Sequence, residues 1–461
     1  MLGPVHDAEG VVALNQLSRR GKGIAVLISL GLIWGYSVFR GQIGEDSEWS
    51  GLLLALGTLG IFSFLLQAGG LRTSPPQESL RWLVILFAFF VAFQLVPLPM
   101  GLLRSISPAR VEIHDGLGSL GAHSSFVAAS AVPSATMDHL IRILAYGLVF
   151  FLLTDVVHGL RKELWLLAIP IVVIASLQAI VGLLQVGMGE PGTVARGGYI
   201  NRNHFAGLLE MSFPFAVMGA AASVQKVRGE GGLKFASLAG VCLSVATLLL
   251  IGILYSLSRM GFVACLFSIL VMGLSLLMAG SSHPLRRKAV PVLALLIVLA
   301  FVFLPSDPLI ARLADLSSAD EVSDQDRLQV WKETLGLIRE FPWVGSGLGT
   351  YESVFLRHKQ IGEMMRDNYA HNDYLQGLAE LGLLGFSVVA AFLSLALMKT
   401  VSTIYAAASP IMRYLAVACL GSMAAILLHS VVDFNLYVEP NAMLLSWVSA
   451  IAVSLPFASA S

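Results

Sequence analysis

The chain has little charge and few cysteines for its length. Only 13% of its 461 residues are Asp, Glu, Lys or Arg, and the charges balance to a net charge of zero at pH 7. This balance gives no support for binding to nucleic acid. Cys242, Cys265 and Cys419 all lie within apolar runs, where a free cysteine acts as a small apolar side chain. The sequence therefore predicts no disulfide framework, and it contains no internal repeat and no low-complexity segment.

Hydrophobic residues, in contrast, are abundant. They make up 56% of the chain and fall in runs long enough for a helix to cross a bilayer. This composition predicts an all-α polytopic membrane protein. We expect about 12 transmembrane helices, at residues 23–39, 51–69, 80–103, 137–154, 164–187, 205–223, 234–256, 260–280, 289–304, 373–398, 414–432 and 440–458.

The distribution of Lys and Arg predicts the orientation. With the N-terminus in the cytoplasm, the inside connections carry basic clusters and the short outside connections carry few basic residues. The segment 1–22 is polar, and the apolar run after it has no cleavage site, so we expect a cytoplasmic tail and a retained first helix. The chain then divides into transmembrane helices 1–9 (23–304), an outside loop domain (305–372) and transmembrane helices 10–12 (373–461).

The two long outside segments differ in pattern. Residues 104–136 are rich in Ser, Ala and Gly, and we expect a partly ordered loop. The loop domain 305–372 carries helix signals: Asp324 can cap a helix that Phe341-Pro342 would stop, and a second amphipathic stretch begins at Glu352. Short helices lying on the membrane fit this pattern.

The stretch Ala370–Gln376 lies where the loop domain runs into a membrane helix. Ionisable groups at such a position tend to mark function. An imidazole ionises near pH 6.5, which suits proton abstraction, so His371 is a candidate catalytic base. The alternative is an ordinary histidine satisfied by a backbone group. Asn372 is a candidate to position the imidazole or a sugar hydroxyl, and we expect Asp373 to cap the following helix.

Arg196 and Arg259 lie in short outside connections, against the positive-inside bias. Guanidiniums bind phosphate well, so both are candidate anion ligands. Arg259 could instead be an anchor whose side chain snorkels to the lipid headgroups. Arg196 leads through a glycine-containing turn to a helix N-terminus, which is a favourable place for phosphate.

Polar residues around this helix start are further candidates for binding substrate. They are Asn201, Arg202 and Asn203, with His204 as another donor, and one of the two asparagines is expected to cap the helix.

The other candidate substrate-binding residues lie further along the chain. Asp433 and Asn435 belong to the last outside turn, and Arg327 and Tyr369 belong to the loop domain. Asp326-Arg327 can also be explained as a salt-bridged helix start. No His, Cys or carboxylate spacing predicts a metal site.

Six short motifs follow one another along the chain: Arg196–Ala206, Ser258–Gly261, Asp326–Trp331, Pro342–Tyr351, His371–Gln376 and His429–Leu436. Together and in this order they resemble the O-antigen ligase and Wzy-type polymerase superfamily, and the resemblance covers about residues 170–450. It implies a GT-C-like helical bundle with a large periplasmic loop, which fits 305–372. The essential arginines of the family match Arg196 and Arg259, and its essential histidine matches His371. Many members have Asn-Pro-Asn where this chain has Asn201-Arg202-Asn203, so Arg202 adds either a second diphosphate contact or none.

The resemblance also implies the reaction. The donor is a glycan on undecaprenyl diphosphate, and the acceptor is a hydroxyl of another glycan or of lipid A-core. Transfer takes place at the periplasmic face of the bacterial inner membrane and uses no metal or other cofactor. A displacement in one step should also invert the anomeric centre. Polymerase, ligase and protein O-glycosylation all stay open as alternatives.

A membrane transporter of an anion or small solute is the competing hypothesis. It predicts broken helices in two symmetric halves and charged residues at mid-membrane. Here the polar residues gather at one face, and only Glu210 and His429 are expected to lie deep. This pattern favours the enzyme.

Overall fold

The computed structural model describes residues 5–40, 55–61, 75–118, 124–227, 232–279, 324–358, 369–407 and 409–455. The labelled elements are α1 (Val5–Arg40), α3 (Pro75–Gln94), β1 (Pro97–Pro99), α4 (Met100–Ile106), α5 (Pro108–Gly118), β2 (Phe126–Ala128), α6 (Pro133–Gly159), η1 (Leu164–Ala168), α7 (Ile169–Met188), α8 (Arg202–Val227), α9 (Gly232–Tyr255), α10 (Arg259–Ala279), α13 (Asp324–Glu340), α14 (Tyr351–Phe355), α15 (Asp373–Ala406), α16 (Pro410–His429), η2 (Asn435–Tyr437) and α17 (Glu439–Ser454).

Eight helices in the described residues are long and apolar enough to cross a membrane. They are Arg20–Arg40 of α1, α6, η1 with α7, α8, α9, α10, α15 and α16. The prediction of a polytopic, all-α membrane protein is confirmed. The count of twelve stays a prediction. The predicted span 289–304 and most of 51–69 lie outside the described residues, α3 is not among the eight, and α17 has only 16 residues.

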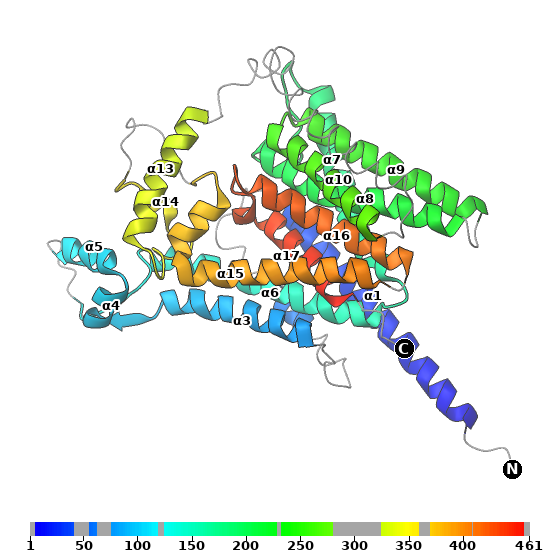
Figure 1. The fold of residues 1–461 in the computed structure, drawn as a ribbon, viewed down its shortest axis with the longest axis horizontal. Helices are drawn as coiled ribbons and strands as arrows, with labels where there is room; N and C mark the ends of the chain where they lie inside the picture. The colour runs from blue at the N-terminus through cyan, green and yellow to red at the C-terminus, as the bar shows by residue number, and fades with distance from the viewer. Residues whose placement is uncertain are drawn as a thin grey trace.

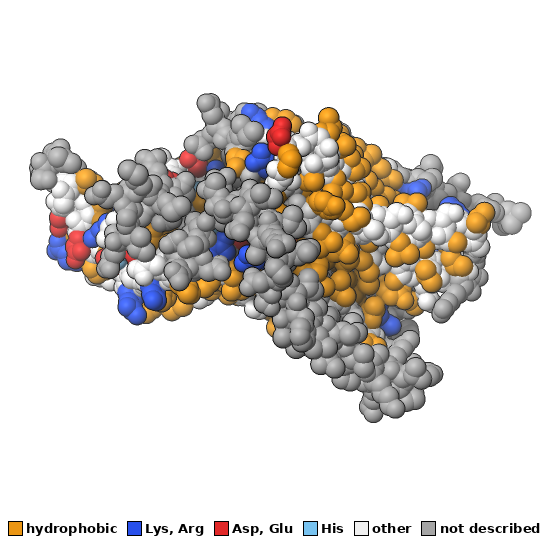
Figure 2. Space-filling view, turned by 90° about the horizontal axis from the view of Figure 1, so that it is seen from above, with side chains coloured by type: hydrophobic (Ala, Val, Ile, Leu, Met, Phe, Trp, Pro, Cys, Tyr) orange, Lys and Arg blue, Asp and Glu red, His pale blue; other side chains and the backbone are white. Residues whose placement is uncertain are grey.

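The most buried of these eight helices is α8, which packs against α9, α10, α16, α7 and α17. Figure 1 shows α7 to α10 on one side of α16 and α17, with α15, α3 and α6 on the other. The helices of the loop domain, α13 and α14, lie at one end of this bundle together with α4 and α5. In Figure 2 hydrophobic side chains cover the middle of the body, and acidic and basic ones gather mainly toward that end.

The structure corrects two predictions, one span boundary and one loop. The span predicted at 80–103 ends at Gln94, and β1 then pairs with β2 in an antiparallel ladder. Pro97 and Pro99 explain the early end, because proline cannot continue a helix without losing a hydrogen bond. The segment 104–136 is more than a partly ordered loop: it holds α5 and β2, and Val111 and Val127 pack with Leu103 in a small apolar core.

In the loop domain, α13 begins at Asp324 and ends at Glu340, directly before the expected stop at Phe341-Pro342. The helix α14 is short, and residues 359–368 lie outside the described part of the chain. Between α13 and α14, Gly345, Gly347 and Gly349 have φ of +72°, +110° and +81°, values that residues other than glycine rarely adopt. This turn docks on α15, where Glu380 accepts the backbone N–H of Gly349 at 2.9 Å.

Candidate active site

The end of the bundle near the loop domain brings together the start of α15 and the connection between α16 and α17. The backbone N–H of Asp373 donates to the carbonyl of Ser430 at 3.0 Å and contacts that of Asp433 at 3.2 Å. In return, the Asp373 carboxylate accepts the N–H of Leu436 at 3.1 Å. These bonds fix the residue that follows His371 and Asn372 to the turn that carries Asp433.

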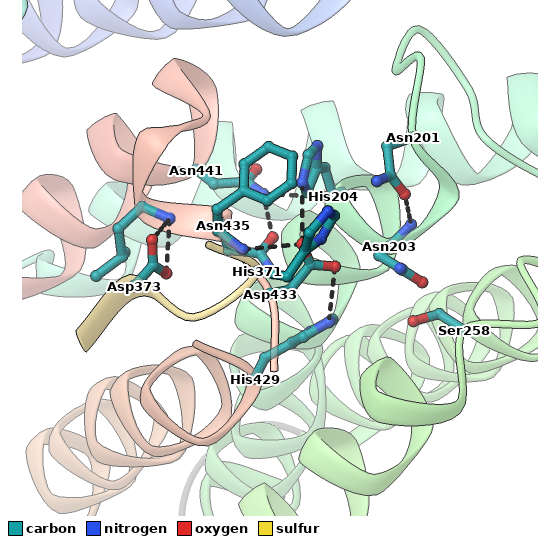
Figure 3. Close-up of polar contacts among 12 residues, drawn as sticks. Asn201, Asn203, His204, Ser258, His371, Asp373, His429, Asp433, Asn435 and Asn441 are labelled. Atoms are coloured by element: carbon teal, nitrogen blue, oxygen red, sulfur yellow. Dashed lines mark hydrogen bonds and ion pairs between the residues drawn. The ribbon is translucent and has the colours of Figure 1, made fainter. Parts of the chain in front are cut away.

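Asp433 lies among three imidazoles (Figure 3). Its Oδ1 is 3.5 Å from His204 Nε2 and 3.8 Å from His371 Nδ1, and its Oδ2 is 3.9 Å from His429 Nε2. These are ion-pair distances rather than hydrogen bonds, and catalytic contacts are often this long before substrate binds. The Asp433 side chain is only 2% exposed, whereas that of His371 is 19% exposed. His371 is therefore the one of the three that is open toward the surface.

The charge of Asp433 follows from these neighbours. Burial alone would raise the pKa of this carboxyl, but the polar contacts with His204 and His371 outweigh it and hold the pKa well below its usual range. Asp433 is therefore a carboxylate at neutral pH. A carboxylate beside Nδ1 fixes the orientation of an imidazole and stabilises its protonated form, and it leaves Nε2 of His371 for a substrate.

His371 has a strained backbone, with φ at +47°. Such a conformation in a residue other than glycine persists only where the surroundings fix it, and it is common at functional sites. The helix cap lies directly after it, and here the prediction was wrong. Asn372, not Asp373, caps α15, because Asn372 has extended φ and ψ and its side chain accepts from the N–H groups of Tyr374 and Leu375, both at 3.0 Å.

An aromatic cluster supports the same imidazole. Tyr369 stacks on Phe434 with ring centroids 3.9 Å apart and planes at 5°, and His371 meets the same Phe434 ring edge-on at 5.0 Å. His204 meets it edge-on as well, at 4.5 Å. Phe434 thus holds both histidines that share Asp433 Oδ1, and Tyr369, a predicted substrate-binding residue, is half-buried beside them.

The loop of Arg196 lies beside the connection that carries Arg259. Ala195 donates its N–H to the carbonyl of Tyr255 at 2.9 Å, and Arg196 donates its own to the Gln185 side chain at 3.2 Å. Tyr255 ends α9 and Arg259 begins α10, and both arginines are exposed.

The start of α10 packs on the start of α8. A Cβ on Gly261 would come within 2.5 Å of the Ala206 Cβ, so only glycine allows this approach. Figure 3 shows Ser258, just before α10, across from Asn203. Both arginine segments therefore lie close to His204. That the guanidiniums of Arg196 and Arg259 share one cavity with His371 stays a prediction.

The remaining predicted residues have the following surroundings. Asn201 accepts the N–H of Asn203 at 2.8 Å and caps α8, so one of the two asparagines caps this helix as expected. Arg202 is half-buried at the first position of α8. Asn435 is fully buried and accepts from the Asn441 amide at 3.0 Å.

In α13, Arg327 is half-buried, and one turn further on Trp331 donates to the carbonyl of Ala370 at 3.0 Å, which ties the loop domain to the His371 segment. The proposed salt bridge of Asp326 falls on a side chain outside those described.

Sequence reasoning missed Asn441. This buried amide also donates to the carbonyl of His204 at 2.9 Å and accepts from the Tyr199 hydroxyl at 2.9 Å. It therefore joins the last turn, the start of α8 and the Arg196 loop. An asparagine at the start of an apolar span was the available signal.

The described residues thus place a buried carboxylate, Asp433, against the partly exposed His371, near the two segments that carry Arg196 and Arg259. Residues 244–390 match the family model described as O-Antigen ligase. This segment, less than half of the chain, is similar to the O-antigen ligase family, in agreement with the four of the six motifs that lie within it. The matched segment includes Arg259 and His371. No curated protein matches the chain, and the transporter alternative gains no support from these comparisons.

Proposed function

We propose that the chain transfers a glycan from a polyprenyl-diphosphate donor to an acceptor hydroxyl at the periplasmic face of the bacterial inner membrane. The product would enter O-antigen or exopolysaccharide assembly. The single observation that best supports this proposal is the contact between His371 Nδ1 and the buried Asp433 carboxylate, within a chain that matches the O-antigen ligase family. That contact leaves the more exposed side of the imidazole for a substrate proton.

The proposed reaction is one displacement. His371 Nε2 takes the proton of the acceptor hydroxyl while the oxygen of that hydroxyl attacks the anomeric carbon of the donor sugar. The bond from that carbon to the diphosphate oxygen breaks, and its electron pair leaves with the diphosphate. Attack from the side opposite the leaving group inverts the anomeric centre. Asp433 stabilises the imidazolium that forms on His371.

The leaving group gains negative charge as its bond to the sugar breaks. Arg196 and Arg259 are exposed beside the N-terminal ends of α8 and α10, where the helix dipoles also favour an anion. Guanidiniums stay charged and bind phosphate bidentately, so we assign both to the diphosphate. Arg202 at the first turn of α8 is a further diphosphate contact in this proposal.

The acceptor approaches from the loop domain in this proposal. Trp331 of α13 bonds to the residue directly before His371, so a molecule held by this domain would lie next to the base. The polyprenyl tail of the donor would lie in the bilayer against lipid-facing helices such as α9, where Leu238, Val241 and Leu243 are exposed.

The test is transfer by purified protein in vesicles that contain a lipid-diphosphate-linked glycan and an acceptor glycan. The wild type should release polyprenyl diphosphate and lengthen the acceptor, in the presence of EDTA as in its absence. His371→Gln should lose on the order of 10²–10⁴ in rate. His158→Gln is the matched control. Among the described residues, this half-buried histidine has its one hydrogen bond with the carbonyl of Thr154 in its own helix, so the variant should keep full activity. Donor that disappears from one leaflet without transfer would favour the transporter instead.

A further inference from the structure

A second polar pair lies deeper in the bundle than the proposed site. His429 of α16 and Glu210 of α8 are both fully buried, and His429 Nδ1 lies 3.0 Å from Glu210 Oε1 and 3.1 Å from Oε2. Ionisable groups inside membrane helices are unfavourable, and they are retained mainly where they have a function. Nothing in the proposed transfer step uses this pair directly.

The other nitrogen of the same imidazole faces the proposed site. His429 Nε2 lies 3.9 Å from Asp433 Oδ2 and has no hydrogen bond within the described residues. Asp433 contacts His371 through its other oxygen. Glu210, His429, Asp433 and His371 thus form one continuous series of contacts from the bundle interior toward the surface. Figure 3 shows its part from His429 through Asp433 to His371.

A purely structural pair is the plainer explanation, since interhelical hydrogen bonds also fasten membrane helices. Such a pair requires only the bond from Nδ1 to Glu210. It gives no reason for Nε2 to point at a second carboxylate that is itself buried and contacts His371. An imidazole between two carboxylates can satisfy both only when each ring nitrogen donates a proton. His429 is placed to do so.

We propose that Glu210 and His429 are positioning residues of the transfer reaction, and this inference rests on the proposed function. His429 carries a proton on each ring nitrogen: Glu210 accepts a hydrogen bond from Nδ1–H, and Nε2–H is directed at Asp433 Oδ2. Asp433 is then held with Oδ1 toward His371 Nδ1, which keeps Nε2 of His371 directed at the acceptor hydroxyl. Neither Glu210 nor His429 touches substrate.

The first test separates positioning from binding. Glu210→Gln and His429→Asn should each lower kcat by about ten- to a hundredfold, as the loss of residues that orient active groups does, and leave the KM for the lipid-linked donor unchanged. Ser212→Ala in α8 and Ser422→Ala in α16 are matched controls, because both serines are buried in the same two helices. Both control variants should keep the wild-type kcat. Glu210→Asp replaces Glu210→Gln if the latter does not elute as folded protein.

The second test uses the two ring nitrogens. Glutamine places its amide near the position of Nε2, and asparagine places it near that of Nδ1. His429→Gln should therefore keep the contact with Asp433 and recover part of the kcat that His429→Asn loses. In an Asp433→Asn background, Glu210→Gln should cause no further loss, because residues that act in series are not additive. If Glu210→Gln acted through a packing defect, its loss in kcat would instead multiply with that of Asp433→Asn.

The outcomes are distinct. A wild-type protein that transfers no glycan overturns the proposed function, and this inference with it. An active wild type with an inactive His371→Ala variant, but Glu210→Gln and His429→Asn at the level of the serine controls, overturns the inference alone. Losses that multiply in the Asp433→Asn background also overturn it. Serial losses in kcat, with partial recovery by His429→Gln, support it.

Discussion

Replacing Asp433 with asparagine removes a charge and almost no volume. The side chain is 2% exposed and lies within 4 Å of three imidazoles, so no water can take its place easily. In the variant, an amide nitrogen or a neutral oxygen faces His371 Nδ1. Neither stabilises an imidazolium as a carboxylate does, and the amide nitrogen favours the wrong tautomer.

The expected loss can be bounded. Substituting the carboxylate that orients a catalytic histidine in serine proteases lowers kcat by about 10⁴. The contact here is 3.8 Å, longer than a hydrogen bond, so we expect a smaller loss, on the order of 10²–10³ in kcat. The KM for the donor should stay unchanged, because the diphosphate is assigned to the arginines. Folding stability should also fall, by roughly 1–3 kcal/mol, since buried imidazoles lose their partner.

The assay is single-turnover transfer in vesicles at saturating donor, with thermal unfolding of the same samples in detergent. Asn441→Asp is unsuitable as a control because it adds a buried charge. Ser212→Ala is suitable, because it removes a buried hydroxyl that donates to the carbonyl of Leu208 in its own helix. A folded Asp433→Asn variant with the wild-type kcat would refute the role of this carboxylate. So would a variant whose only defect is a raised donor KM.

Three further predictions concern the arginines, the loop domain and pH. Arg259→Lys keeps the charge but loses the planar fork, so kcat should fall on the order of 10², measured in the same vesicles; an unchanged rate would argue against a bidentate diphosphate contact. Exchanging residues 305–372 for those of a relative with another acceptor should change the acceptor preference and leave donor use intact, as chromatography of the products would reveal; an unchanged acceptor range in a folded chimera would count against this role. Because folding lowers the pKa of Asp433, its contribution to stability is present above the unfolded pKa near 4 and is lost as pH falls below it. The melting temperature of the wild type should therefore drop more between pH 7 and pH 3 than that of Asp433→Asn, and equal drops would contradict the assignment.

The sequence predicted the helices well, because the length of an apolar run reports a transmembrane helix directly. The end of α3 at Gln94 had a local signal, because Pro97 and Pro99 follow it in sequence. The partners of Gln94 had none. Its amide donates to the carbonyls of Val344 and Glu380 at 2.8 and 2.9 Å, and these residues lie 250 and 286 positions away in sequence.

In the candidate site, too, the sequence identified residues but not their contacts. Asparagine and aspartate are both favourable helix caps, so only the extended backbone of Asn372 decides between Asn372 and Asp373. Sequence placed Glu210 and His429 deep in the membrane, but their bond spans 219 positions and needed the packing of α8 on α16. Asp433 was predicted near substrate, and its place among three imidazoles emerged only from the fold.

A structure with the lipid-diphosphate-linked donor bound tests the central claim most directly. We predict that Arg196 and Arg259 both contact the diphosphate, and that His371 Nε2 lies within hydrogen-bond reach of the acceptor hydroxyl position, with Nδ1 still facing Asp433. A donor bound with either arginine more than about two side-chain lengths from the diphosphate, or with His371 on the opposite membrane face, would contradict the account, because charge stabilisation of this kind acts only at contact range.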